Sequence, residues 1–194
     1  ADLEALLTER TRLVAFPHVS NITGDINDVE AITDLCHKAG ALACVDGVAL
    51  APHRAVDVKK WDVDIYFFSF YKVFGPHLGL MYTKQQLLSQ CKGQYHYFFG
   101  EDDLAHKLNP AGPNHETIAS LVGIADYFDA LHGHHFSNQS DDFFSRVQAV
   151  FEVIACHEER LGAEFLDFIA AKPRIHLIGG TDSAAAARVP TFSM

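Results

Sequence analysis

Apolar residues fall into short runs separated by polar turns along the first part of the chain. The run from Leu13 to Phe16 predicts a short buried strand. A helical pattern follows, in which we expect Asn27 to cap the helix, with Glu30 three residues on in the spacing of a capping box. Gly40 is expected to end this helix, and an apolar strand then runs to Asp46. Strand, helix and strand joined by short links predict a parallel sheet.

The pattern continues with a second core strand, predicted from Ile65 to Tyr71 and ending on a lysine. A strand from Gly79 to Tyr82 follows after a short turn, and so short a link favours antiparallel pairing. The spacing of apolar residues then predicts three helices and one loop. We place the helices at 84–92, 114–132 and 141–171 and the loop at 93–113. Pro173 ends the last helix, and Ile175 to Ile178 begins a new element. The expected fold class is therefore α/β.

Composition excludes several classes of partner. The chain has 194 residues, of which 48% are hydrophobic, enough for a globular core. Its formal net charge of −10 argues against nucleic acid or an anionic membrane as a partner. Charged residues or histidines interrupt every apolar stretch, so none reaches the length of a membrane span.

The cysteines and the two ends of the chain bear on its location. The four cysteines have no metal-binding spacing, which favours reduced and mostly buried thiols. The acidic N-terminal segment lacks the basic region of a secretory signal. Together these features lead us to expect a cytoplasmic protein. The chain opens without an initiator methionine and closes in a strand-like run, so both ends resemble cuts through a longer protein.

Two charged residues follow the predicted core strands. Asp46 ends one strand and Lys72 ends the next, at the positions where ligand sites form in open α/β sheets. Seven uncharged residues precede Lys72, which predicts a desolvated amine suited to Schiff-base chemistry. An aspartate at a strand end is by itself more typical of a turn. Beside such a lysine, however, it can hold a pyridinium nitrogen protonated. The pair therefore predicts pyridoxal phosphate.

Several segments carry a resemblance to a known family. They read L-V-A-F-P-H-V-S-N-I-T-G, V-D-G-V-A-L-A-P-H-R, S-F-Y-K-V-F-G-P-H-L-G and L-N-P-A-G-P-N-H, in this order along the chain. They are similar to the class V aminotransferase family of fold-type I pyridoxal-phosphate enzymes, which includes cysteine desulfurases and selenocysteine lyases. The resemblance implies the large domain, with a mostly parallel sheet and flanking helices, over 1–172. The start of the small C-terminal domain is then expected over 173–194. It also implies a homodimer that acts on a small amino acid.

The same resemblance implies a role for each of five residues. Lys72 would form the Schiff base and carry the α-proton of the substrate. Asp46 would pair with the pyridine nitrogen, and Asn21 would lie near the phenolic oxygen of the cofactor and the substrate carboxylate. Ser69 would donate to the phosphate, and Tyr71 stands where many members have a phosphate-binding histidine.

The chain also departs from the family pattern, which leaves the reaction open. Ala49 stands where desulfurases usually have a glutamine, and Gly112 stands where a threonine is expected. None of the four cysteines matches the persulfide-forming nucleophile, and other expected site residues would lie outside the chain. We therefore expect little activity from this chain alone. Desulfuration, β-elimination and transamination remain alternatives for the parent. So does a non-catalytic relative that keeps the fold as a binding or scaffold module.

Three further features of the sequence could serve a function. His53 matches a common family position, but a structural role is the preferred interpretation. The histidines at 132, 134 and 135 match no metal motif, and no metal site is predicted there. The aromatic cluster at 95–99 suits either a subunit contact, an active-site loop or core packing.

Overall fold

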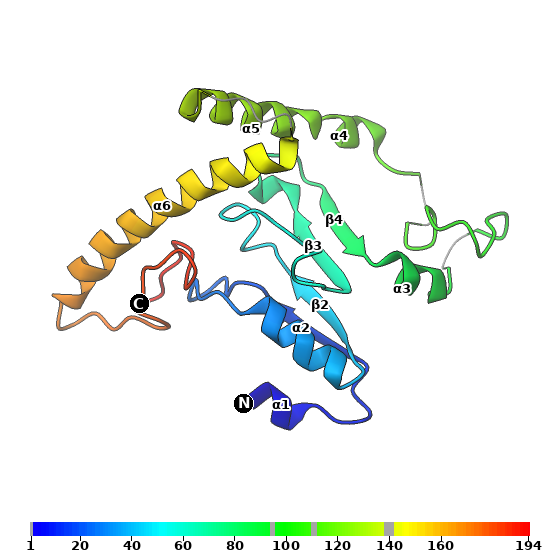
Figure 1. Cartoon of the computed structure of the whole chain (residues 1–194), viewed down its shortest axis with the longest axis horizontal. Coiled ribbons are helices and arrows are strands. Elements are labelled where there is room, and N and C mark those ends of the chain that lie inside the picture. Colours follow the sequence, from blue (N-terminus) through cyan, green and yellow to red (C-terminus); the bar gives the residue numbers. More distant parts are fainter. Residues whose placement is uncertain (1, 94–95, 110–111, 138–141) are drawn as a thin grey trace.

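The computed structural model of the chain describes residues 2–93, 96–109, 112–137 and 142–194. In this part of the chain a small sheet is combined with helices that are arranged around it (Figure 1). The strands are β1 (Leu13–Pro17), β2 (Leu42–Asp46), β3 (Ile65–Ser69) and β4 (Gly79–Thr83). The helices are α1 (Asp2–Leu6), α2 (Val29–Lys38), the 3-10 helix η1 (Phe70–Lys72), α3 (Gln85–Gln90), α4 (His115–Ala119), α5 (Val122–His135) and α6 (Phe143–Ala170).

The sheet has the order β1-β2-β3-β4. The first two pairings are parallel, and β4 joins β3 in the antiparallel sense. Pro17 lies opposite Asp46, and Asp46 lies opposite Phe67. The carboxyl ends of β1, β2 and β3 therefore meet at one edge of the sheet. The predicted α/β class, the parallel sheet and the antiparallel last strand are confirmed.

The core is built on one face of this sheet. Val45 and Tyr66 are neighbours in register and fully buried, and they pack with Val29 of α2. The same core continues to Phe128 of α5 and Phe151 of α6, which pack against the β3 side chain Phe68. Asp46 has the opposite orientation from Val45, because successive side chains of a strand point to opposite faces.

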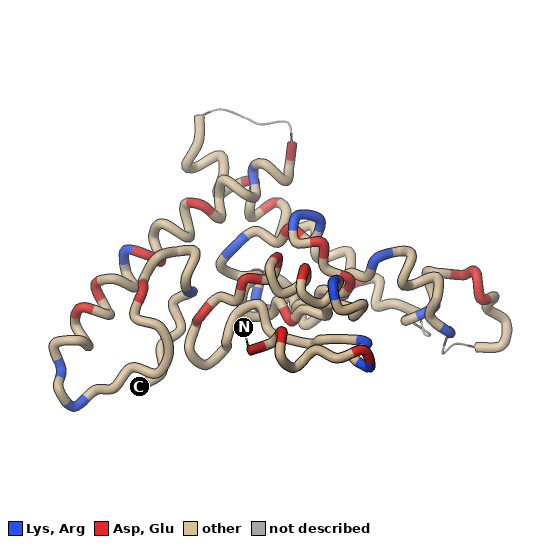
Figure 2. Tube along the Cα trace, turned by 60° about the horizontal axis from the view of Figure 1, so that its bottom comes forward, with Lys and Arg blue, Asp and Glu red and all other residues tan. Residues whose placement is uncertain are grey.

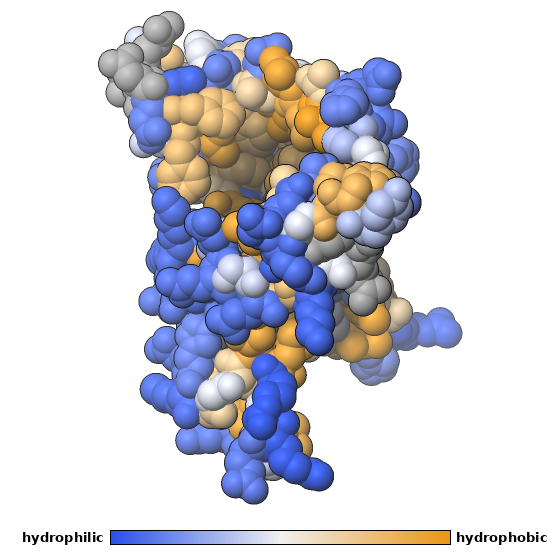
Figure 3. Space-filling view, turned by 90° about the vertical axis from the view of Figure 1, so that its right-hand side faces the viewer, coloured by the Kyte–Doolittle hydropathy of each residue, from blue (hydrophilic) through white to orange (hydrophobic). Residues whose placement is uncertain are grey.

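The opposite face and the outer edge of the sheet are more open. Leu13 of β1 is 46% exposed and Met81 of β4 is 51% exposed. Figure 3 shows apolar side chains exposed around a hollow on the side of the molecule to the right in Figure 1. Acidic residues outnumber basic ones by 25 to 15, and both kinds are spread along the trace (Figure 2). Among the described residues, no helix combines the length and the apolar character needed to cross a membrane.

Several predicted boundaries were wrong. The cap of α2 is Asp28, whose carboxylate accepts a hydrogen bond from Ala31 N at 3.0 Å. Asn27 instead donates its side-chain amide to Pro17 O at 2.8 Å and so ties the helix entrance to β1. Glu30 therefore falls one position too early for a capping box. Gly40 does follow the helix, with the positive φ of +72° that favours glycine.

Other differences concern the second half of the chain. The predicted helix at 114–132 is two helices, because α4 ends at Ala119 and α5 begins at Val122. The predicted helix at 84–92 is shorter, and the one at 141–171 is described from Phe143 to Ala170, residue 141 lying outside the described residues. The predicted loop at 93–113 includes residues 94, 95, 110 and 111, which also lie outside them. Residues 175–178 form no strand and make one isolated bridge, between Ile178 and Ser193.

Candidate functional site

Asp46 is the last residue of β2, and its carboxylate is half-buried at the edge of the sheet. Oδ1 accepts a hydrogen bond from Val48 N at 2.9 Å, the arrangement of a turn residue. Gly47 N donates to Phe67 O at 2.8 Å, so the chain stays attached to β3 just past the aspartate. Within the described residues, no lysine, arginine or histidine nitrogen lies within 4 Å of this carboxylate, so its charge has no counter-ion there.

Buried aromatic residues fix the position of this turn. Gly47 lies directly against the ring of Tyr66, and a Cβ at this position would overlap that ring. The Tyr66 hydroxyl is 3.1 Å from His18 Nδ1, and His18 N donates to Asp46 O at 2.8 Å. The His18 ring meets Trp61 edge to face with centroids 4.6 Å apart. The Asp46 backbone is therefore held by the backbone N–H of His18, the residue just after β1, and the turn after it rests on the ring of Tyr66 from β3.

The groups beneath Asp46 are uncharged at neutral pH. Burial lowers the pKa of His18 to about 4, so the imidazole is neutral. Burial, and after it the negative charge of Asp46, raises the pKa of the Tyr66 hydroxyl. The buried side chains that hold the Asp46 turn, His18 and Tyr66, are therefore neutral and do not neutralise its carboxylate.

Lys72 follows β3 but does not end the strand as predicted. The strand stops at Ser69, and Lys72 is the last residue of η1. Val73 N donates to Phe70 O at 2.8 Å and closes this turn. Phe74 then has a φ of +61°, unusual for a bulky residue, with its ring packed against Tyr127 of α5 at 4.7 Å. The expected desolvation of Lys72 was wrong for this chain, because the side chain is exposed.

The other three predicted residues, Ser69, Tyr71 and Asn21, lie at or just after the ends of β3 and β1. Ser69 ends β3 opposite Gly79 of β4 and is half-buried. Tyr71 is 48% exposed and stacks on His77, with centroids 5.2 Å apart. Asn21 is exposed in the turn that follows β1. The structure thus places the five predicted residues at or after the carboxyl ends of three adjacent strands, and the side-chain roles assigned to them stay predictions.

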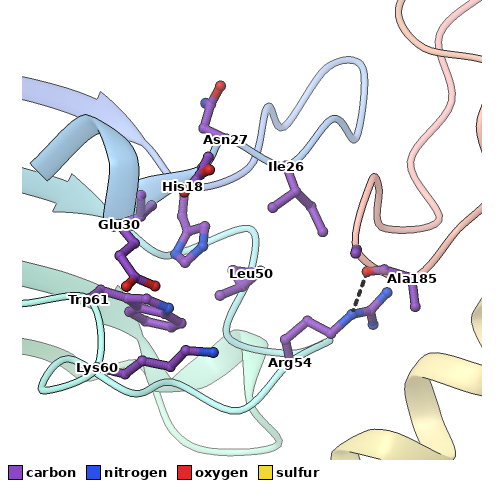
Figure 4. Close-up of a pocket in the computed structure, with 12 residues that line it drawn as sticks. His18, Ile26, Asn27, Glu30, Leu50, Arg54, Lys60, Trp61 and Ala185 are labelled. Carbon is purple, nitrogen blue, oxygen red and sulfur yellow. Dashed lines mark hydrogen bonds between the residues drawn. The ribbon is translucent and has the colours of Figure 1, made fainter. Parts of the chain in front are cut away.

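A separate pocket lies beside this edge (Figure 4). Its volume is about 500 Å³, and none of the five predicted site residues lines it. His18 and Leu50 point into it in Figure 4, with Trp61 and Lys60 along one side. Arg54 closes another side through a hydrogen bond from Nε to Ala185 O at 3.1 Å.

His53 and Arg54 form a structural cluster with α6. His53 Nδ1 is 2.6 Å from one carboxylate oxygen of Glu158, and Arg54 Nη1 is 2.6 Å from the other. These contacts tie the loop after β2 to α6, which agrees with the structural role expected for His53. In the described part of the chain, no group of three or more His, Cys, Asp or Glu residues could hold a metal ion.

The comparison with protein families decides the family of the chain. The model of the class-V aminotransferases matches residues 1–139. The chain belongs to the class V aminotransferase family. It is 38% identical to the aminotransferase-like protein FGM3 of Gibberella zeae over 98% of this chain and 44% of that protein. It is 33% identical to the cysteine desulfurase-like protein ustD of Aspergillus flavus over 99% of this chain and 41% of that protein.

Solved structures of this family share the fold. The crystal structure of the cysteine desulfurase CsdA from Escherichia coli matches with a TM-score of 0.66 and 27% identity, over 93% of this chain and 44% of that one. A NifS-like protein from Rickettsia africae, 18% identical, matches in fold with a TM-score of 0.61 over 97% of this chain and 45% of that one. The chain therefore spans about 44% of the length of such relatives.

The donor groups of this class V chain fit the cofactor that the family implies. A pyridine ring that carries a proton requires an anion, and Asp46 is a carboxylate without a counter-ion among the described residues. The aldehyde group of this cofactor requires an amine with which to form a Schiff base. Lys72 carries an amine, and it has no ion pair in the part of the chain that the structure describes. The two charges follow neighbouring strands yet lie too far apart to pair with each other, which leaves both available to a ligand.

Sequence reasoning missed three residues that organise this site. His18 and Tyr66 support Asp46, and Arg188 contacts the turn that carries Asn21. A histidine directly after an apolar strand was the one local signal for His18. Nothing around Arg188 indicated its contacts, because they reach a segment at the other end of the chain.

Proposed function

We propose that the full-length protein is a pyridoxal-phosphate enzyme of the class V aminotransferase and cysteine desulfurase-like type that acts on a small amino acid. One observation carries this proposal. Asp46 and Lys72 follow adjacent parallel strands, and neither charge is neutralised by another residue of the described chain. Asp46 is a half-buried carboxylate and Lys72 an exposed amine, so this edge of the sheet, where ligands bind in such folds, offers one anion and one cation to a ligand that can pair with both.

Each residue has a distinct task in this proposal. When bound, pyridoxal phosphate supplies an electron sink for bonds at the α-carbon of the substrate. Asp46 would keep a proton on the ring nitrogen. Lys72 Nζ would hold the cofactor covalently as a Schiff base and would move the substrate proton. Ser69 would donate to the phosphate, and Tyr71 would contribute to the same phosphate site.

Asn21 completes the proposed site from the third strand. Its side-chain amide can donate and accept, which suits contact with both a phenolic oxygen and a carboxylate. The support beneath Asp46 is neutral at physiological pH, so the ring nitrogen is the cation that this carboxylate meets. Desulfuration, β-elimination and transamination all begin with these contacts, so the contacts do not distinguish among the three reactions.

The proposal extends to the assembly and its location. We infer a homodimer, since Tyr97 and Phe98 are 98% and 63% exposed, a degree that suits contact with a second subunit. We also infer a cytoplasmic protein, since all four cysteines are free thiols, as is usual in a reducing compartment.

A titration of the full-length protein with pyridoxal phosphate tests the proposal. We expect a visible absorption band of the bound cofactor that shifts when a small amino acid is added. Lys72→Ala and Lys72→Arg should lose this band, whereas Lys60→Ala, which removes an exposed lysine of the neighbouring pocket, should keep it. No band in the wild-type protein, or an unchanged band in both Lys72 variants, would contradict the proposal. A panel of cysteine, selenocysteine and amino donors then assigns the reaction.

One observation favours a second candidate function, a non-catalytic module with the same fold. Ala49 packs in an apolar cluster with Val19, Leu50 and Val189, where the desulfurase pattern would offer a polar side chain. A relative that has lost this contact could keep the fold as a scaffold. The same titration separates the two candidates, because a scaffold gives no band and no shift with amino acids.

A further inference from the structure

The turn that carries Asn21 is covered by a segment from the far end of the chain. Residues 20–25 follow β1, and residues 178–193 follow α6, yet the two lie side by side (Figure 1). Asp25 forms an isolated antiparallel bridge with Arg188, and Gly180 N donates to the Asp25 carboxylate at 3.0 Å. We call residues 178–193 the clasp segment.

Three successive carbonyl groups of the turn are bound by the clasp segment. They belong to the three residues directly after Asn21, so the clasp segment binds the backbone next to Asn21. The pairs are Ser193 Oγ to Ile22 O at 2.5 Å, Arg188 Nη2 to Thr23 O at 2.8 Å and Val189 N to Gly24 O at 2.9 Å. Bonds to consecutive peptide groups fix the orientation of each peptide plane.

Arg188 is the centre of these contacts. Its side chain is buried, with 3% of the residue exposed. Besides Thr23 O, the guanidinium donates to Gly180 O at 2.5 Å and to Thr191 O at 2.7 Å. It also lies over the ring of Phe192, 4.3 Å from the centroid. The guanidinium thus joins one carbonyl of the turn to two carbonyls of the clasp segment, and a shift of the turn would remove the Thr23 acceptor from a buried charge.

Gly24 shows how closely the two segments approach. Its φ is +78°, and a Cβ built there would lie 2.7 Å from Val189 O. The backbone of the clasp segment therefore rests directly on the backbone of the turn.

We propose that Arg188 is the positioning residue for Asn21. It fixes the turn so that the Asn21 amide is presented at the sheet edge beside Asp46, while Arg188 itself touches no ligand. This assignment rests on the proposed function, in which Asn21 contacts the cofactor. It makes the segment after α6 a part of the cofactor site, although no side chain of that segment lies among the proposed ligands.

A double-variant cycle in the full-length protein tests the assignment. The measurements are the dissociation constant of pyridoxal phosphate and the pH at which the visible band of the bound cofactor changes, which reports on the phenolic oxygen. We expect Asn21→Ala and Arg188→Lys each to weaken binding about tenfold, the effect of one lost hydrogen bond to a polar group. The double variant should bind about as weakly as Asn21→Ala alone, since contacts that act as a unit are not additive.

Arg54→Lys is the matched control. Arg54 holds the same segment through Ala185 O and Arg188 O, and its hydrogen bonds in the described chain go to no residue of the turn. Its effect on binding, if there is one, should add to that of Asn21→Ala. Ser193→Ala removes one bond of the clasp segment and keeps the test available when Arg188→Lys does not fold. It should show the same non-additivity with Asn21→Ala.

The outcomes distinguish a failure of the positioning role from a failure of the proposed function. Additive losses for Asn21→Ala with both Arg188→Lys and Ser193→Ala overturn the positioning role and leave the proposed function intact. Wild-type binding by Asn21→Ala overturns it as well. A wild-type protein that binds no pyridoxal phosphate overturns the proposed function, and the assignment with it.

Discussion

Asp46 and Asn21 lie at the same edge of the sheet but are held in different ways. The turn at Asp46 rests on Tyr66 and His18. Tyr66 belongs to the neighbouring strand β3, and His18 directly follows the other neighbouring strand, β1. The turn at Asn21 is bound by Arg188, which lies 165 residues from its acceptor Thr23. The residues that hold the Asp46 turn belong to the sheet and its core. The residue that holds the Asn21 turn comes from the segment after α6, at the other end of the chain.

The two supports also differ in their electrostatics. Beneath Asp46 the buried groups are neutral at physiological pH, because burial depresses the pKa of His18. Beside Asn21 the buried group is a guanidinium, which remains charged at any pH that the fold survives. Acid should therefore weaken the first support and leave the second, whereas steric changes at the clasp segment should weaken the second alone.

The largest effect is expected at the close approach beside Asn21. Gly24→Ala places a Cβ against backbone carbonyls and forces a non-glycine residue to a φ of +78°. We expect the free energy of unfolding to fall by about 3 kcal/mol or more. Gly40→Ala is the matched control, because Gly40 has a φ of +72° but nothing within 4 Å of the added Cβ. It should lose only about 1 kcal/mol. Equal losses in urea unfolding would show that the clasp segment is not tightly apposed.

Acid should act next, through His18. Its pKa is 6.5 in the unfolded chain and about 4 in the fold, so between these values the unfolded state binds more protons. Stability is then lost as the pH falls from about 6.5 towards 4, by about 2 to 3 kcal/mol for this group. Urea unfolding of the wild type and of His18→Gln at pH 7 and pH 4.5 measures the difference. Parallel losses in the two proteins would show that His18 does not titrate in this way.

Tyr66→Phe removes one bond of the Asp46 support. The change leaves His18 Nδ1 without its partner and should lower the free energy of unfolding by about 1 to 2 kcal/mol. The acid sensitivity described above should persist, because burial and not the hydroxyl lowers the pKa of His18. Thermal or urea unfolding of the variant at pH 7 provides the measurement, and wild-type stability would argue that the bond is not formed.

The smallest effect is expected from Ser193→Ala. This change removes one hydroxyl donor from Ile22 O in a partly exposed position and should cost about 1 kcal/mol or less. Its loss should be independent of pH between 7 and 4.5, in contrast to the contribution of His18. A pH-dependent difference between Ser193→Ala and wild type would contradict the separation of the two supports.

The sequence predicted the parts of the fold that depend on local patterns. The strand, helix and strand before Asp46 carry their own apolar periodicity and glycine stop, so the parallel sheet and the position of Asp46 followed directly. Asn27 was chosen as the helix cap in place of Asp28 because both residue types cap helices. Only the geometry shows which side chain reaches Ala31 N.

The remaining errors depend on distant residues. The exposure of Lys72 depends on what covers the end of β3, and the residues before it in sequence do not determine that. The contacts of Arg188 join positions at opposite ends of the chain, so no window of sequence contains both partners. The strand ends that carry the predicted site residues could therefore be located from the sequence, while the supports of the two turns could not.

The central claim is that Lys72 carries the cofactor between the strand ends that bear Asn21 and Asp46. Borohydride reduction of the full-length protein after incubation with pyridoxal phosphate, followed by peptide mass spectrometry, tests it most directly. We predict a pyridoxyl group on the peptide that contains Lys72 and none on Lys72→Arg treated in the same way. A protein that retains no pyridoxyl group, or one that carries it specifically on another lysine, would contradict the account.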